Sequence, residues 1–218
     1  MNVSPTKENV LKKIRQALSN PVPAPFSNSE GSGQFFHASE EDLAVQFANT
    51  FSALQGRFVF CSDEKELVQQ LGQLIQSRNW QSLVCRELAM QHMLQSNGSH
   101  FTFYDRLSDC DASITGCELL VSRTGTIVLS SASESGRTAS VYAPVHICIA
   151  YTAQLVYDLK DAMEQLRQKY GQQLPSFISF ATGPSRTADI EKTLVVGVHG
   201  PKEVFVFLVD QPMPDPVS

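Results

Sequence analysis

The sequence lacks the long apolar segment of a membrane helix, and it is poor in positive charge. No run of about 18 apolar residues occurs in it, so we expect no transmembrane helix. The first residues, Met1 to Glu8, contain no apolar signal-peptide core, so we expect a cytoplasmic protein. The chain has 17 Lys and Arg against 22 Asp and Glu, a net charge of −5. That balance argues against nucleic acid or an anionic membrane surface as the main partner.

Closely spaced cysteine pairs are also absent. No C-x-x-C motif joins any of the five cysteines, which are Cys61, Cys85, Cys110, Cys117 and Cys148. Zinc and iron–sulfur sites usually take their thiolates from such pairs, so we expect no metal and no cluster on this chain. Three of the cysteines lie in apolar, strand-like runs, which favours buried thiols over a redox role.

The length of 218 residues predicts one main domain with an appendage. An amphipathic helix is expected over residues 5–18, with Val10 and Ile14 on its apolar face. Alternating prolines and a Ser/Gly-rich stretch follow, which favour extended chain. We therefore predict an N-terminal helix and Pro/Ser-rich tether over residues 1–38, and the main domain over residues 39–218. The helix could dock on a partner or be a mobile terminus.

From Ser39 to about residue 104, helical patterns alternate with short apolar runs. Ser39 with Asp42, and Asp63 with Glu66, resemble capping boxes that open helices. A further helix is expected over residues 87–95, and strands over residues 57–61, 82–85 and 101–104. Strands separated by helices of this length predict a parallel sheet covered on both faces.

The second half has a different pattern. Residues 118–122 and 126–130 flank Arg123-Thr124-Gly125 and predict a β-hairpin. Three more strands are expected, over residues 145–151, 176–180 and 204–209. Between the first and the second of them, a helix is expected over residues 155–170, ending at Gly171. The expected fold is α/β, with a mixed, mostly parallel sheet flanked by helices and an inserted β-hairpin.

Three loops carry the residues best suited to chemistry. The first, residues 130–138, combines four serines, Gly136 and Arg137 after a strand. Hydroxyls, backbone N–H groups and a guanidinium together make an anion cradle. A solvated, Ser-rich loop is an equally good interpretation of the composition.

The second loop, residues 182–191, follows an apolar strand, where ligands collect in open α/β sheets. Ser185 or Thr187 could cap a short helix whose N–H groups face an anion, and Arg186 would add a bidentate clamp. Asp189 and Glu191 could act in the site, or they could complement a helix dipole or pair with Arg186.

The third loop places His199 between glycines, in Gly197-Val198-His199-Gly200-Pro201, which leaves its imidazole unshielded. A catalytic role and a structural one are about equally supported for His199, and His146 is a weaker candidate. Glu118, at the mouth of a predicted strand, could be a base or nucleophile, although an edge charge that discourages aggregation explains it as well.

These motifs resemble those of the LUD domain family. The resemblance rests on Gly183-Pro184-Ser185-Arg186-Thr187-Ala188-Asp189-Ile190-Glu191 together with Gly197 to Pro201, and on shorter motifs at Ile114-Thr115-Gly116, Thr124-Gly125-Thr126, Gly136-Arg137 and Pro144-Val145-His146. It is strong from about Thr115 to Asp210 and diffuse over residues 40–114. The resemblance implies a fold of the NagB/RpiA/CoA-transferase type.

The resemblance also implies a function. It points to a component of a multi-protein system that oxidises L-lactate to pyruvate, with an iron–sulfur subunit and a ferredoxin-like oxidoreductase as partners that carry the clusters. In that system this chain would bind a small carboxylate or phosphate-bearing ligand without a cofactor of its own. The alternative is a stand-alone enzyme of the CoA-transferase or cyclo-ligase type.

The residues expected to act are of two kinds. The candidate catalytic residues are Glu118, Asp189, Glu191 and His199. The candidate ligand-binding residues are Thr124, Gly125, Ser130, Ser131, Gly136, Arg137, Gly183, Ser185, Arg186, Thr187 and Gly200.

Overall fold

The computed structural model describes residues 5–19, 41–190 and 193–211, without the side chains of residues 5–6, 17–18, 188–190 and 193–194. The chain divides into two units, residues 1–38 and residues 39–218. The described part of the first unit is helix α1 (Pro5–Leu18), which confirms the helix expected there. Its apolar side chains Val10 and Ile14 are about half exposed.

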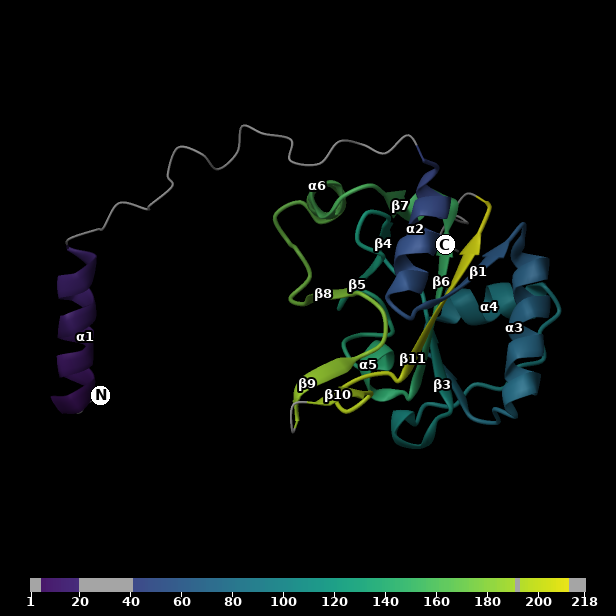
Figure 1. Cartoon of the computed structure of the whole chain (residues 1–218), viewed down its shortest axis with the longest axis horizontal. Coiled ribbons are helices and arrows are strands. Elements are labelled where there is room, and N and C mark those ends of the chain that lie inside the picture. The colour runs from purple at the N-terminus through teal and green to yellow at the C-terminus, as the bar shows by residue number, and fades with distance from the viewer. Residues whose placement is uncertain (1–4, 20–40, 191–192, 212–218) are drawn as a thin grey trace. The chain divides into compact units, whose positions relative to one another are not determined.

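A five-stranded sheet forms the centre of the second unit (Figure 1). Its strand order is β1-β11-β6-β3-β2, and every neighbouring pair is parallel. The strands are β1 (Arg57–Cys61), β2 (Leu83–Cys85), β3 (Ala112–Thr115), β6 (Val145–Tyr151) and β11 (Glu203–Val209). The three central strands are almost wholly buried on both faces. Burial on both faces is why β6 and β11 are mostly apolar along their whole length.

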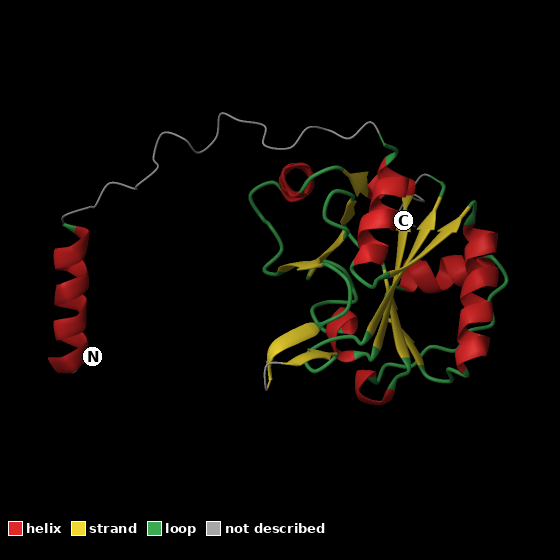
Figure 2. Cartoon of the chain, viewed as in Figure 1, coloured by secondary structure: helices red, strands yellow, loops and turns green. Residues whose placement is uncertain are grey.

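Helices α3 (Glu64–Arg78) and α4 (Leu88–Ser96) cover one face of this sheet (Figure 2). Asp63 caps α3 by accepting from the Glu66 amide at 2.8 Å, as the sequence predicts. On the other face lies α2 (Leu43–Ala53), which begins at the cap residue Asp42.

A smaller mixed sheet packs on the same face as α2. Its order is β7-β4-β5-β8, with β4 (Leu119–Val121), β5 (Thr126–Ser130), β7 (Leu155–Val156) and β8 (Ile178–Ala181). Strands β4 and β5 are antiparallel, so the predicted hairpin is confirmed. Its outer face packs against α6 (Leu159–Tyr170), which ends at Gly171 with a φ of 58°.

Several predicted elements differ. The strand over residues 101–104 is wrong, since only Phe103 makes an isolated bridge, to Leu83. Strand β3 was not predicted, because its buried sequence Ala-Ser-Ile-Thr is short and half polar. Helix α6 begins at Leu159 rather than Leu155, because Asp158 caps it and residues 152–156 form a short 3-10 turn and β7.

The loop over residues 182–191 also differs. Its described residues, 182–190, form no helix; instead β9 (Arg186–Ile190) pairs antiparallel with β10 (Thr193–Val196). The remaining described elements are a 3-10 turn at Leu107–Asp109 and the short helix α5 (Ala139–Tyr142). None of the described helices is both long and apolar enough to cross a bilayer.

Candidate functional site

A groove of about 260 Å³ lies where the two sheets meet, at the N-terminal ends of β6 and β11. Four of the predicted site residues line it, namely Gly183, Ser185, His199 and Gly200, together with the weaker candidate His146. Residues that the sequence did not single out complete the lining, among them Ser140, Val141, Ser179 and Thr182. The second and third predicted loops therefore do meet in one place.

Backbone hydrogen bonds join these two loops. The amide of Ser185 donates to the Pro201 carbonyl at 3.0 Å, and the amide of Gly197 donates to the Ser185 carbonyl at 2.9 Å. Gly200 lies so close to Ser185 that a Cβ at Gly200 would stand 2.8 Å from the Ser185 Cβ. The glycine is needed here because any side chain would displace Ser185 at the groove.

His146 is the buried polar residue of this groove. It is 1% exposed, and its Nε2 lies 2.8 Å from the Thr115 hydroxyl, which donates to the Gly116 carbonyl at 2.8 Å. A hydroxyl has one proton, so Nε2 must be the donor to Thr115, and Nδ1 carries the lone pair. Burial lowers the pKa of His146 to about 4, so the ring is neutral at pH 7.

Arg186 points away from the groove, toward the end of α2. Its guanidinium donates to the Leu54 carbonyl and, at 3.3 Å, to Gln55 Oε1. A Cβ at Gly183, whose φ is +82°, would stand 2.8 Å from the same Leu54 carbonyl. A cation at a helix C-terminus is favourable, so Arg186 serves here to hold the loop on α2.

The loop over residues 130–138 does form an anion cradle, but a carboxylate of the chain itself occupies it. Glu87 accepts hydrogen bonds from the Ser133 hydroxyl at 2.8 Å, the Ser135 hydroxyl at 2.7 Å and the Gly116 amide at 3.1 Å. Next to it, Glu134 accepts from the Leu88 amide at the start of α4. The Ser-rich composition thus reflects an internal contact with the first turn of α4.

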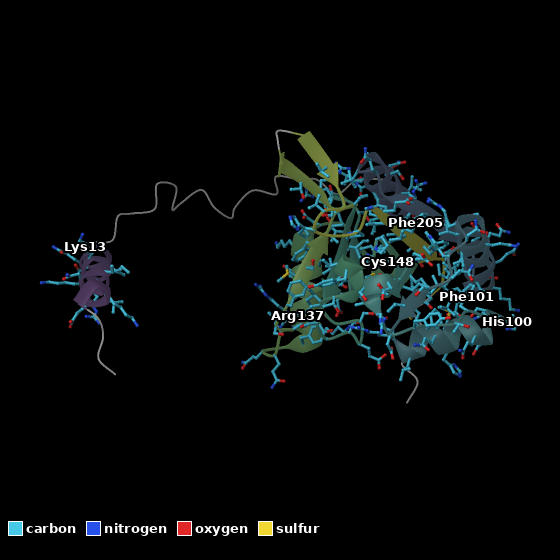
Figure 3. The ribbon with its side chains drawn as sticks, turned by 90° about the horizontal axis from the view of Figure 1, so that it is seen from below. Lys13, His100, Phe101, Arg137, Cys148 and Phe205 are labelled. Atoms are coloured by element: carbon cyan, nitrogen blue, oxygen red, sulfur yellow. The ribbon has the colours of Figure 1, made fainter. Side chains whose placement is uncertain are left out.

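The other predicted residues of this loop bond elsewhere. Arg137 donates to the Ser176 hydroxyl at 2.7 Å and lies over the Phe177 ring, with 5.7 Å between the guanidinium carbon and the ring centroid. Ser131 contacts the same Ser176 hydroxyl at 3.3 Å. Figure 3 shows Arg137 at the outer edge of the domain, whereas Cys148 lies in its interior. Gly136 has a φ of +62°, with open space where a Cβ would be.

Glu118 is buried and saturated with hydrogen bonds. It accepts from Lys169 at 2.8 Å, Tyr170 at 2.7 Å and Ser130 at 2.5 Å, and its side chain is 8% exposed. Burial acts to raise its pKa, but the hydrogen bonds from these three residues and the charge of Lys169 lower the pKa overall. A carboxylate held in this way is a poor nucleophile.

Thr124 and Gly125 take part in packing between the hairpin and α2. The Thr124 hydroxyl lies 2.8 Å from that of Thr126, which lies 2.9 Å from that of Thr182. Gly125 has a φ of +58°, and a Cβ there would stand 2.8 Å from the Phe51 amide nitrogen.

Three more predicted residues lie in or beside β9. Thr187 is half-buried and pairs in register with Val195 of β10. The side chain of Asp189 and the whole of Glu191 lie outside the described residues.

A second hollow, of about 350 Å³, lies at the carboxyl ends of β1, β6 and β11. Ligands often bind at this edge of an open α/β sheet. Its polar side chains come from Asp42, Thr152 and Asp210, and it contains none of the predicted residues. We favour the smaller groove, because it contains a buried imidazole with an available lone pair.

The cysteines are all free thiols. Cys61, Cys85, Cys110 and Cys148 are buried and Cys117 is half-buried, so the expected burial of the three strand cysteines is confirmed. Within the described part of the chain, no cluster of three or more His, Cys, Asp or Glu side chains is arranged to hold a metal ion.

Comparison with known proteins adds a family to this geometry. The family model described as LUD domain matches residues 44–209. Lactate utilization protein C 1 of Bacillus mycoides is 31% identical, over 93% of this chain and 93% of that protein. Lactate utilization protein C of Shouchella clausii is 40% identical, but the alignment spans 46% of this chain and 44% of that relative. An uncharacterized protein of Neisseria meningitidis serogroup B is 25% identical over 97% of this chain.

A solved structure shows a similar fold. The crystal structure of a DUF162 family protein from Deinococcus radiodurans superposes with a TM-score of 0.58, over 77% of this chain and 96% of that one. The two sequences are 20% identical, so the likeness concerns the fold alone.

Proposed function

The chain belongs to the LUD domain family, and on that premise we propose that it is a subunit, without a cluster of its own, of a system that oxidises L-lactate to pyruvate. The observation that carries this proposal is the similarity to Lactate utilization protein C 1 of Bacillus mycoides over 93% of both chains. Oxidation of L-lactate to pyruvate releases two electrons and two protons. An iron–sulfur subunit and a ferredoxin-like oxidoreductase would accept the electrons.

In that system this chain would bind the small carboxylate in the groove beside His146. The lining offers the hydroxyls of Ser140, Ser179 and Ser185, which can donate to a carboxylate, and the exposed imidazole of His199. Arg137 donates to the Ser176 hydroxyl and Arg186 to the Leu54 carbonyl, so the groove would bind the carboxylate without either guanidinium.

The family fold also suggests a finer assignment, to the NagB/RpiA/CoA-transferase type. The parallel five-stranded sheet with a smaller mixed sheet on one face supports it. A stand-alone CoA-transferase reaction would need a carboxylate nucleophile, and Glu118 is poorly suited to that role because Lys169, Tyr170 and Ser130 hold it. We therefore prefer the subunit to the stand-alone enzyme.

Reconstitution tests the proposal. The full chain is produced with the iron–sulfur and ferredoxin-like proteins, purified through a tag on this chain, and assayed for L-lactate-dependent reduction of a dye. We expect the three proteins to purify together and lactate oxidation to fall when this chain is left out. Ser185→Val should lower the rate, whereas Ser96→Ala on the outer surface of α4 should not. Unchanged oxidation without the chain, together with no co-purification, would contradict the proposal.

A further inference from the structure

The lone pair of His146 is the unusual feature of the groove. His146 is the second residue of β6, and the alternation of the strand places its ring on the same face as Cys148, toward the smaller sheet. Thr115 takes the Nε2 proton, and in the described part of the chain Nδ1 has no hydrogen-bond partner. Nδ1 is not among the fully buried unpaired atoms of the described residues, so it is accessible from the groove, where a ligand can donate to it in place of water.

The rest of the lining is suited to a small, polar anion. The hydroxyls of Ser140, Ser179 and Ser185 also lack a partner within the described residues, so each can donate. No Lys, Arg, Asp or Glu is among the described lining residues, and the only other imidazole is that of His199. A volume of about 260 Å³ is enough for a compact molecule.

We propose that this groove binds a 2-hydroxy monocarboxylate, with the ligand hydroxyl donating to Nδ1 of His146 and the carboxylate accepting from the serine hydroxyls. The inference rests on the proposed function and names the ligand class of the same site. It also predicts a direction of selectivity. A 2-keto acid places an acceptor oxygen against the Nδ1 lone pair, and an unsubstituted acid leaves that lone pair without a donor.

Thr115 is the positioning residue for this selectivity. Its hydroxyl proton is committed to the Gly116 carbonyl, so Thr115 can only accept from Nε2, and this holds the proton away from Nδ1. Thr115 does not line the groove. Without its hydroxyl, the ring could carry its proton on Nδ1 and donate to a keto oxygen instead.

The test titrates the purified full chain with L-lactate, pyruvate and propionate by calorimetry, and follows His146 by ¹⁵N NMR. For the wild type we expect L-lactate to bind on the order of tenfold more tightly than either other acid, since one hydrogen bond distinguishes them. Nδ1 should be unprotonated in the free protein, and its resonance should move with L-lactate. Thr115→Val and His146→Gln should each reduce the preference, whereas His92→Gln, on α4 outside the groove, should keep it.

Each outcome decides the inference. Three results would overturn the inference: equal affinities for the three acids, no binding of L-lactate, or a proton on Nδ1 in the free wild type. The NMR measurement is made on the wild type, so it does not depend on whether any variant folds. If the chain prefers L-lactate but is dispensable in reconstitution, the proposed function is wrong, whereas the assignment of the groove to a 2-hydroxy acid still holds. If the chain is required but L-lactate does not bind it, the site fails and the proposed function remains.

Discussion

The exposed side chain of Lys169 forms an ion pair with the buried side chain of Glu118, with 2.8 Å between Nζ and Oε2. The pair ties the last turn of α6 to the residue that precedes β4, although the two side chains are 51 residues apart. The Glu118 side chain is 8% exposed and that of Lys169 is 60% exposed. Glu118 therefore joins the helix to the smaller sheet.

Glu118→Gln should destabilise the protein at neutral pH by about 1–3 kcal/mol, because the donors around it lose a charged acceptor. The pKa of Glu118 is lowered in the folded state, so its stabilisation is present above the unfolded pKa of about 4.3 and is lost as pH falls through the folded value. Urea unfolding at a series of pH values should show the variant and the wild type converging in acid. Glu164→Gln, at an exposed surface pair, is the control. A constant difference at all pH values would disagree with this assignment.

His146 should govern stability in a different pH range. Its folded pKa of about 4 lies below the unfolded value of about 6.5, so unfolding takes up a proton and stability is lost as pH falls from about 6.5 to 4. His146→Gln should flatten this part of the curve, by about 3 kcal/mol across the range. Ser179→Ala, in the same groove, should keep the wild-type slope. An unchanged slope in His146→Gln would show that the ring does not titrate as its burial requires.

Arg186→Ala should destabilise the protein by about 0.5–1 kcal/mol, because the Leu54 carbonyl loses a charged donor at the end of α2. Hydrogen exchange should quicken at the last turn of α2, and binding of L-lactate should be unchanged. Arg186→Lys should recover part of the stability, since it keeps the charge. Loss of ligand binding in Arg186→Ala with no change in stability would instead place this side chain on the ligand.

Gly125→Ala should lower stability more than Gly136→Ala. Both glycines have a positive φ, of +58° and +62°. The new Cβ at Gly125 would stand 2.8 Å from the Phe51 backbone nitrogen, whereas the one at Gly136 meets nothing within 4 Å. We expect about 1 kcal/mol for Gly136→Ala from conformation alone and about 2–4 kcal/mol for Gly125→Ala. Thermal unfolding of the two variants side by side measures the difference, and equal losses would rule out the close approach to α2.

Glu87→Ala should empty the cradle formed by Ser133, Ser135 and the Gly116 amide. The three donors would then lack their carboxylate, at a cost of about 1–3 kcal/mol. Sodium acetate should raise the melting temperature of this variant more than that of the wild type, because acetate can supply the missing carboxylate. Sodium chloride at equal ionic strength is the control. Equal effects of the two salts on the variant would contradict a cradle that recognises carboxylates.

The elements that the sequence predicted correctly are those whose pattern is local. The strands at residues 57–61 and 145–151 are continuous apolar runs, and Asp63 caps a helix through its own near neighbour. Strand β3 was missed because two of its four residues, Ser113 and Thr115, are polar and find partners in Ala139 and His146. Those partners lie far along the chain, so no local pattern reveals them.

The sequence by itself determined the family, the α/β class, the hairpin and the absence of cysteine pairs, because motifs and periodicity depend only on residues that are close together in the chain. Only the tertiary structure decided what the polar loops contact. Ser133 and Ser135 donate to Glu87, Arg186 donates to the Leu54 carbonyl, and Lys169 donates to Glu118. Ser185 and His199 line the same groove as His146. The sequence is the same whether a hydroxyl or a guanidinium binds a ligand or another part of the chain. The difference lies in which carboxylate or carbonyl the fold brings within hydrogen-bonding distance.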